Sequence, residues 1–174
     1  DDCYVHGLSG IESMQVIAQL SRFPATEALR RGHEILDFCG MGQERYRPVE
    51  TYSTGMRQKL RFAMAIVHDP KLLILDEPTS GLDPEERMRF RHLLTDLAGQ
   101  RLVILSTPIV SDVEASATAL AVMAAGRLRF HGTPEALIAR ASGHVWEWTL
   151  APEQLADVRA KFVVCASLRR PDGI

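Results

Sequence analysis

Two adjacent carboxylates, Asp76 and Glu77, follow directly after the aliphatic run at residues 72–75. A short, continuous apolar run is typical of a strand that is buried on both faces of a sheet. An aspartate at the carboxyl end of such a strand can hold Mg²⁺, often through water, and a neighbouring carboxylate can orient or deprotonate an attacking water molecule. The pair therefore predicts phosphate chemistry, with Asp76 for magnesium and Glu77 as general base. The alternative is a strand that simply ends in solvated acids.

A second candidate site begins at Ser53, which is followed by Thr54, Gly55 and a helix-like pattern. The free N–H groups and the dipole at the start of a helix favour an anion, so a phosphate is the expected ligand. An ordinary Ser/Thr cap is the alternative interpretation.

The chain lacks a glycine-rich phosphate loop. None of its twelve glycines is followed by lysine, so the pattern G-x-x-x-x-G-K-[ST] does not occur. The lysines, Lys59, Lys71 and Lys161, lie outside glycine-rich turns. We therefore expect only half of a phosphate site. We also expect the start at Asp1, without an initiator methionine or a secretory leader, to be a cut edge.

Composition narrows the class of protein. A chain of 174 residues with 46% hydrophobic content suits a globular domain, and a net charge of −2 with pI near 6.3 gives no general footprint for nucleic acid, which is not an expected partner. The cysteines, Cys3, Cys39 and Cys165, are odd in number and widely spaced, which favours reduced thiols in the cytoplasm. No apolar run approaches the ~18 residues that cross a bilayer.

The hydrophobic pattern predicts a helical front and an alternating back, and thus an α/β fold. A strand, a helix and a second strand at residues 72–75, 84–98 and 102–105 form a crossover unit, which favours parallel pairing. We expect helices at 10–21, 26–39, from 54 onward, 134–141 and 152–161, a hairpin at 119–123 and 128–130, and strands at 145–150 and 162–166. Trp146 and Trp148 share one strand face, where packing is the expected role.

Two segments in this order resemble the ABC-family ATPases. YSTGMRQ at residues 52–58 resembles the signature motif of that family, and LLILDEPTSGLD at 72–83 resembles its Walker B strand and D-loop. The similarity extends over most of the chain, and the YSTGM variant resembles ATP-binding subunits of bacterial ABC exporters. The resemblance implies a partial P-loop NTPase domain with an α-helical subdomain in front of a parallel-sheet core.

The expected organisation follows from the same resemblance. Residues 1–65 would be the helical subdomain with the signature motif. Residues 66–143 would be part of the catalytic core, with Walker B, D-loop and switch region. Residues 144–174 would be a small carboxyl-terminal appendage.

The resemblance also assigns roles, with ATP and Mg²⁺ as cofactors. The signature residues would contact ATP held mainly by the opposing subunit of a head-to-tail dimer: Ser53, Thr54, Gly55 and Gln58. Asp76 would serve magnesium through water, and Glu77 would polarise water. Asp83 would lie at the dimer interface, although Pro84 after it also makes it a helix N-cap. The expected partners are a second copy or a related ATP-binding subunit, and a membrane permease that would hold the protein at the inner face of the cell membrane.

One departure concerns the switch position after the second strand. The family usually has histidine there, and this chain has Pro108, whose ring offers neither a proton nor a side-chain hydrogen bond. Two hypotheses stay open on hydrolysis: an incomplete exporter ATPase subunit, or a short non-hydrolysing partner that lends its signature motif in trans. A nucleic-acid-associated ABC ATPase is a third hypothesis, which the charge and the lack of a second cassette disfavour.

Overall fold

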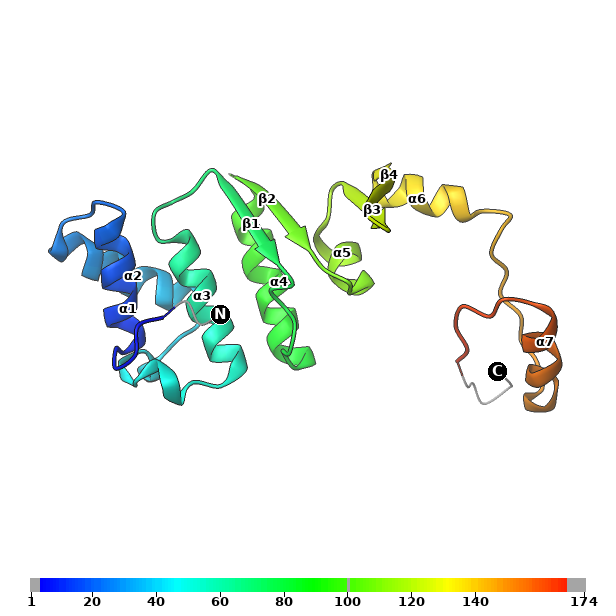
Figure 1. Cartoon of the computed structure of the whole chain (residues 1–174), viewed down its shortest axis with the longest axis horizontal. Helices are drawn as coiled ribbons and strands as arrows, with labels where there is room; N and C mark the ends of the chain where they lie inside the picture. Colours follow the sequence, from blue (N-terminus) through cyan, green and yellow to red (C-terminus); the bar gives the residue numbers. More distant parts are fainter. Residues whose placement is uncertain (1–3, 100, 169–174) are drawn as a thin grey trace. The chain divides into compact units, whose positions relative to one another are not determined.

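The computed structural model describes residues 4–99 and 101–168. It contains two compact units, Asp1–Thr118 and Ala119–Ile174 (Figure 1). The first unit carries the candidate site residues. The α/β class expected from the sequence is confirmed.

Three helices form the front of the first unit, and their apolar faces share one core that includes Met14, Leu36 and Leu60 (Figure 1). The first helix begins with a capping box in which the Ser9 backbone N–H donates to the Glu12 carboxylate at 2.7 Å. Two short 3₁₀ turns, η1 and η2, precede the third helix. These elements are α1 (Gly10–Leu20), α2 (Ala25–Phe38), η1 (Gln43–Tyr46), η2 (Val49–Thr51) and α3 (Thr54–Ile66).

A parallel strand–helix–strand crossover follows, as the sequence predicts. β1 (Leu72–Asp76) pairs with β2 (Leu102–Ser106) in a register that runs from Leu72 opposite Leu102 to Asp76 opposite Ser106. α4 (Pro84–Ala98) connects them and buries Phe90 and Leu94 in the same core as Leu73. Because parallel strands end at the same edge, the segments after β1 and β2 emerge side by side.

The other face of this two-stranded sheet is open, so the prediction of strands buried on both faces was wrong. Leu72, Ile74, Leu102 and Ile104 remain 48%, 67%, 62% and 49% exposed. Residues on one strand alternate between two faces, and α4 covers one of them. Among the described residues of the first unit, no element covers the face that bears these four side chains.

One helix of the first unit was not predicted. α5 (Val110–Ser116) starts after Ile109 without a side-chain cap, and it is seven residues long. Its lack of a start signal explains why the sequence did not reveal it.

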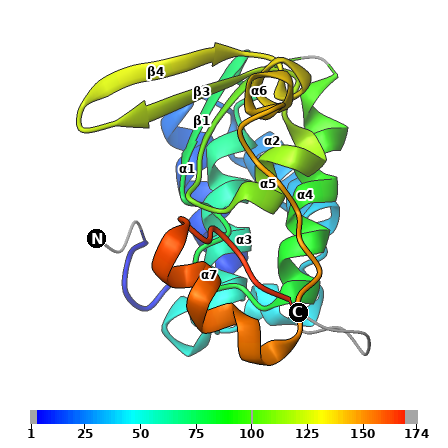
Figure 2. The same ribbon diagram turned by 90° about the vertical axis from the view of Figure 1, so that its right-hand side faces the viewer.

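The second unit contains an antiparallel hairpin, β3 (Leu120–Ala124) and β4 (Arg127–Gly132), followed by α6 (Pro134–Ala141) (Figure 2). The two turn residues have positive φ, +50° at Ala125 and +70° at Gly126, as a tight hairpin turn requires. The predicted hairpin and helix are therefore confirmed. The turn η3 (Pro152–Gln154) and the helix α7 (Leu155–Lys161) together match the helical prediction for 152–161.

The predicted strands at 145–150 and 162–166 are absent, because neither segment forms a ladder with another strand in the described part of the chain. The expected packing of the tryptophans is also wrong. Trp146 is 81% exposed, and Trp148 is 61% exposed with an edge contact to Phe162 at 5.6 Å between ring centroids. Within the described ranges no helix has the length and apolar character needed to cross a membrane.

Candidate functional site

The carboxyl end of β1 presents both predicted acids to solvent. Asp76 and Glu77 are exposed, and the Glu77 backbone N–H donates to the Ser106 carbonyl of β2 at 2.8 Å. Glu77 has φ +44°, a left-handed conformation that is uncommon for a residue other than glycine. Such strained residues cluster at functional sites.

The loop after β1 (residues 77–83, hereafter the β1–α4 loop) is held by local turns. Ser80 N–H donates to the Glu77 carbonyl at 3.1 Å, and Leu82 N–H donates to the Thr79 carbonyl at 3.2 Å. At the end of the loop, Asp83 accepts the backbone N–H of Glu86 at 2.8 Å as the N-cap of α4. The interpretation of Asp83 as an N-cap is therefore confirmed. The side chain is exposed, and its role at a dimer interface stays a prediction.

The amino end of α3 lies against this loop. Ser53 is the N-cap, and its Oγ accepts the Met56 N–H at 3.2 Å. A Cβ added at Gly81 would lie 3.3 Å from the Thr54 methyl group. The signature segment (residues 52–58) and the β1–α4 loop are thus neighbours within one chain.

The place expected for a phosphate is partly occupied by an acid of the same chain. A side chain at Gly55 would collide with the Glu86 carboxylate, which lies directly over it. The partial positive charge at a helix start favours an anion at this position. Glu86 is a flexible side chain, so a phosphate can take this place if Glu86 turns away.

The predicted site residues line two different open pockets, each of about 390 Å³. Gly55 and Glu86 line one pocket with Lys59 and Cys39. Gln58 and Asp76 line the other, beside residues of α3 and α4. The structure therefore brings Gln58 next to the Walker B acid of its own chain, while Gly55 lies beside the start of α4.

Cys39 does not add a nucleophile to the first pocket. Burial raises the pKa of its thiol to about 12. A neutral, buried thiol is inert, because the thiolate is the reactive form.

Pro108, at the position predicted for the switch, has no side-chain hydrogen-bonding group. Pro108 is exposed between β2 and α5, and the neighbouring Ile109 N–H donates to Thr107 Oγ1 at 3.1 Å. The segment is therefore shaped by Thr107 and not by a side chain at 108.

The acids fit a magnesium ion that keeps most of its water. Asp76 supplies a hard oxygen at an exposed strand end, with Glu77 beside it. No group of three or more His, Cys, Asp or Glu suited to a metal occurs in the described part of the chain, so an all-protein cage is not built here. Mg²⁺ usually takes one or two carboxylates, waters and substrate phosphates, which matches this donor set.

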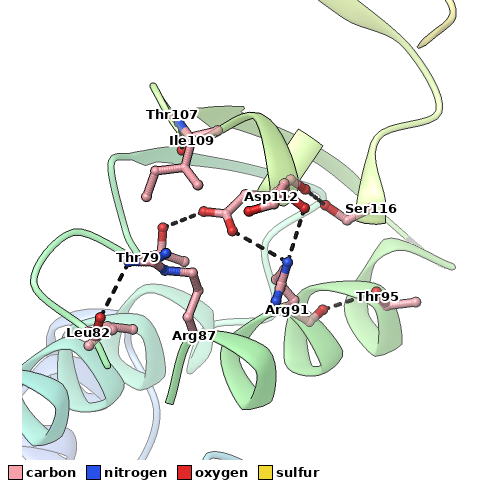
Figure 3. Close-up of polar contacts among 10 residues, drawn as sticks. Thr79, Leu82, Arg87, Arg91, Thr95, Thr107, Ile109, Asp112 and Ser116 are labelled. Atoms are coloured by element: carbon pink, nitrogen blue, oxygen red, sulfur yellow. Dashed lines mark hydrogen bonds and ion pairs between the residues drawn. The ribbon is translucent and has the colours of Figure 1, made fainter. Parts of the chain in front are cut away.

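Sequence reasoning missed a buried polar cluster behind the site. Thr79 Oγ1 donates to Asp112 Oδ2 at 2.6 Å, and Arg91 Nη1 lies 3.8 Å from Asp112 Oδ1 (Figure 3). The three residues come from the β1–α4 loop, α5 and α4. No local signal marks them, because Thr79 and Asp112 are 33 residues apart and α5 was not predicted.

Comparison with known proteins identifies a family and several relatives. A family model described as "AAA domain, putative AbiEii toxin, Type IV TA system" matches residues 10–111. The daunorubicin/doxorubicin resistance ATP-binding protein DrrA of Streptomyces peucetius is 37% identical over 128 residues, which cover 73% of this chain and 39% of that protein. The bacitracin transport ATP-binding protein BcrA of Enterococcus faecalis is 33% identical over 127 residues, which cover 72% and 40%.

A solved structure shows the same fold. The chain is similar to cbiO1 from Clostridium perfringens, described as part of the ABC transporter complex cbiONQ, with a TM-score of 0.71 and 24% identity. The match covers 92% of this chain and 60% of cbiO1.

The family match over residues 10–111 shows an AAA-type domain, and the fold agrees with it. The chain belongs to this family, and its homologues are ATP-binding proteins of ABC transporters. It spans less than half the length of the two bacterial relatives named above.

Proposed function

We propose that the chain is part of the ATP-binding and ATP-hydrolysing subunit of an ABC exporter, and that residues outside it supply the phosphate loop. The observation that carries this proposal is the placement of Asp76 and Glu77 at the carboxyl end of β1, in the same folded unit as the signature segment. The lengths of the relatives and the open apolar face of β1 and β2 support the incomplete domain.

In this proposal each chain contributes residues to two different ATP sites. Asp76 holds Mg²⁺ through water, and Glu77 activates the attacking water. The signature residues of one subunit contact the ATP of the opposing subunit: Ser53, Thr54, Gly55 and Gln58. Asp83, exposed beside them, meets the opposing subunit.

The proposed partners are a second copy or a related ATP-binding subunit, and a membrane permease. The similarity to cbiO1, which belongs to a transporter complex, supports the permease. Such an assembly places the protein in the cytoplasm at the inner face of the membrane. The names of DrrA and BcrA support export and leave the cargo of this protein open.

A second candidate is a short non-hydrolysing partner that lends its signature segment in trans. Pro108 favours it, because the exposed ring at the switch position cannot hydrogen-bond a γ-phosphate. This candidate predicts that ATP is bound with a partner subunit and is not hydrolysed at the site that contains Glu77.

The first test is Glu77→Gln in the intact protein. Loss of the general base should lower kcat about 100-fold or more while ATP binding persists. Glu34→Gln is the control, since Glu34 is an exposed acid on α2 that pairs with Arg30. Phosphate release and binding of labelled ATP measure the two effects. A wild-type protein that binds ATP but releases no phosphate would support the non-hydrolysing partner instead.

The arrangement in trans is tested by mixing two inactive variants, Glu77→Gln and Ser53→Arg. In a mixed dimer one site carries both defects and the other carries none. An equal mixture should therefore regain about a quarter of the wild-type rate if dimers form at random. No recovery in a mixture that still forms dimers would show that Ser53 and Glu77 serve the same ATP.

A further inference from the structure

The buried cluster behind the β1–α4 loop joins three elements that the site uses. Thr79 is 1% exposed and Asp112 is 0% exposed. The Thr79 hydroxyl donates to Asp112 at 2.6 Å, and Arg91 of α4 lies on the other side of the carboxylate while it donates to the Ser111 carbonyl at 3.0 Å (Figure 3). The cluster therefore ties the loop to α5 and α4.

Asp112 is costly to bury, so its contacts matter. A buried carboxylate needs hydrogen bonds or an ion pair to offset the loss of water. Within the described residues Asp112 Oδ1 has no hydrogen bond, and Arg91 at 3.8 Å compensates it through charge. The Thr79 hydroxyl is thus the hydrogen-bond donor at the other oxygen, Oδ2.

Thr79 lies at the centre of the loop that carries the catalytic candidates. It comes two residues after Glu77, inside the turn closed by Ser80 N–H and the Glu77 carbonyl, and its own carbonyl accepts Leu82 N–H. Its side chain therefore holds the loop from behind, while the Glu77 N–H bond to Ser106 holds the loop at β2. Both contacts lead to the segment around Pro108, and the Pro108 side chain itself has no hydrogen-bond donor.

We propose that Asp112 is a positioning residue, which acts through Thr79 to hold the β1–α4 loop against α5 and so orients Glu77 and Asp83. The role in hydrolysis rests on the function proposed above. The role in holding the loop rests on the geometry alone. The Thr79–Asp112 hydrogen bond joins the segment after β1 to the segment after β2. A side chain at the switch position would otherwise make this connection, and Pro108 cannot.

The first experiment measures the loop without reference to activity. Thr79→Val removes the hydroxyl and keeps a side chain of similar size, and Thr79→Ser keeps the hydroxyl. Thr95→Val is the control, because Thr95 lies exposed on α4 and its hydroxyl donates to the Arg91 carbonyl. In the intact protein, hydrogen exchange at the amides of Glu77, Ser80 and Leu82 should become about tenfold faster in Thr79→Val. Exchange should change less than about twofold in Thr79→Ser and Thr95→Val. Unchanged exchange in Thr79→Val would overturn the proposal.

The second experiment separates positioning from general stability. Thr79→Val should lower kcat about tenfold with KM for ATP within about twofold, and Thr79→Ser should retain most of the wild-type rate. Thr79→Val combined with Asp112→Ala should be no slower than Asp112→Ala alone, because Asp112→Ala already removes the acceptor of the Thr79 hydroxyl. Additive losses would contradict the link, and circular dichroism checks that each variant is folded.

The two proposals fail in different ways. A wild-type protein that neither binds nor hydrolyses ATP overturns the proposed function, and the exchange experiment still decides whether Asp112 holds the loop. Should Thr79→Val not fold, Asp112→Ala carries the same exchange measurement, because it removes the oxygen that accepts the Thr79 hydroxyl.

Discussion

At the scale of single residues, the amino end of α3 is the site expected to bind a phosphate, but a carboxylate of the same chain occupies it. Ser53 caps the helix, and the Glu86 carboxylate lies over Gly55, where the helix dipole favours an anion. Glu86 therefore stands in for the negative charge that a phosphate would bring. An incoming γ-phosphate would meet a like charge at this position.

Glu86→Gln should therefore tighten ATP binding in the assembled protein. Removing a like charge near the start of α3 is expected to lower KM for ATP about threefold, and the effect should shrink as salt rises. Glu85→Gln is the matched control, because Glu85 is the preceding residue and pairs with Arg89 on the exposed side of α4. Equal KM values for both variants would show that Glu86 does not compete with the nucleotide.

At the scale of elements, α1 and α2 approach closely at a glycine. A Cβ at Gly32 would lie 3.1 Å from the Ile11 Cδ1 atom and 3.2 Å from Met14 Cβ, which is tighter than an ordinary contact. The glycine costs helix propensity and permits the packing of two helices. The need for close packing outweighs the loss of helix propensity at Gly32, because Met14 Cβ is fixed to its backbone and cannot move aside.

Gly32→Ala should destabilise the fold by about 1–3 kcal/mol through overpacking, despite the better helix propensity of alanine. Gly99→Ala is the contrasting variant, since Gly99 has φ −63° and nothing within 4 Å of an added Cβ. It should be neutral or add up to about 1 kcal/mol. Urea denaturation measures both. A stabilising Gly32→Ala would mean that α1 and α2 separate easily.

The elements were predictable where the local signal was strong. The capping box at Ser9, the N-cap pattern at Asp83 and the change of period after residue 70 placed α1, α4 and the two parallel strands correctly. α5 has no cap, and the alternation at 145–150 lacked a partner strand, so local pattern failed in both cases. The Thr79–Asp112 bond depends on tertiary folding and has no local signature.

At the scale of the whole molecule, the open face of β1 and β2 is the feature that most favours a longer domain. Four aliphatic side chains on one face of a parallel sheet remain about half exposed or more. Parallel sheets are normally covered on both faces. The proposed phosphate-loop segment, with its own strand and helix, would provide that cover.

Ile74→Thr in the intact protein tests whether other residues bury the open face of β1 and β2. If other residues bury Ile74, the substitution should cost about 1–3 kcal/mol, through lost apolar burial and a buried hydroxyl. Ile138→Thr is the matched control, because Ile138 is 71% exposed on α6, against 67% for Ile74. Its effect should stay within about 0.5 kcal/mol. Equal melting temperatures for the two variants would show that the face stays open.

The left-handed backbone at Glu77 also bears on how such a protein evolves. Glycine adopts φ +44° without steric cost, whereas glutamate does not, so the chain gives up stability to keep a carboxylate at this position. Selection for heat resistance alone would therefore favour Gly or Asn at residue 77. If Glu77 is the general base proposed above, selection for turnover would restore Glu, and these two opposed pressures would make residue 77 a point of trade-off between stability and activity.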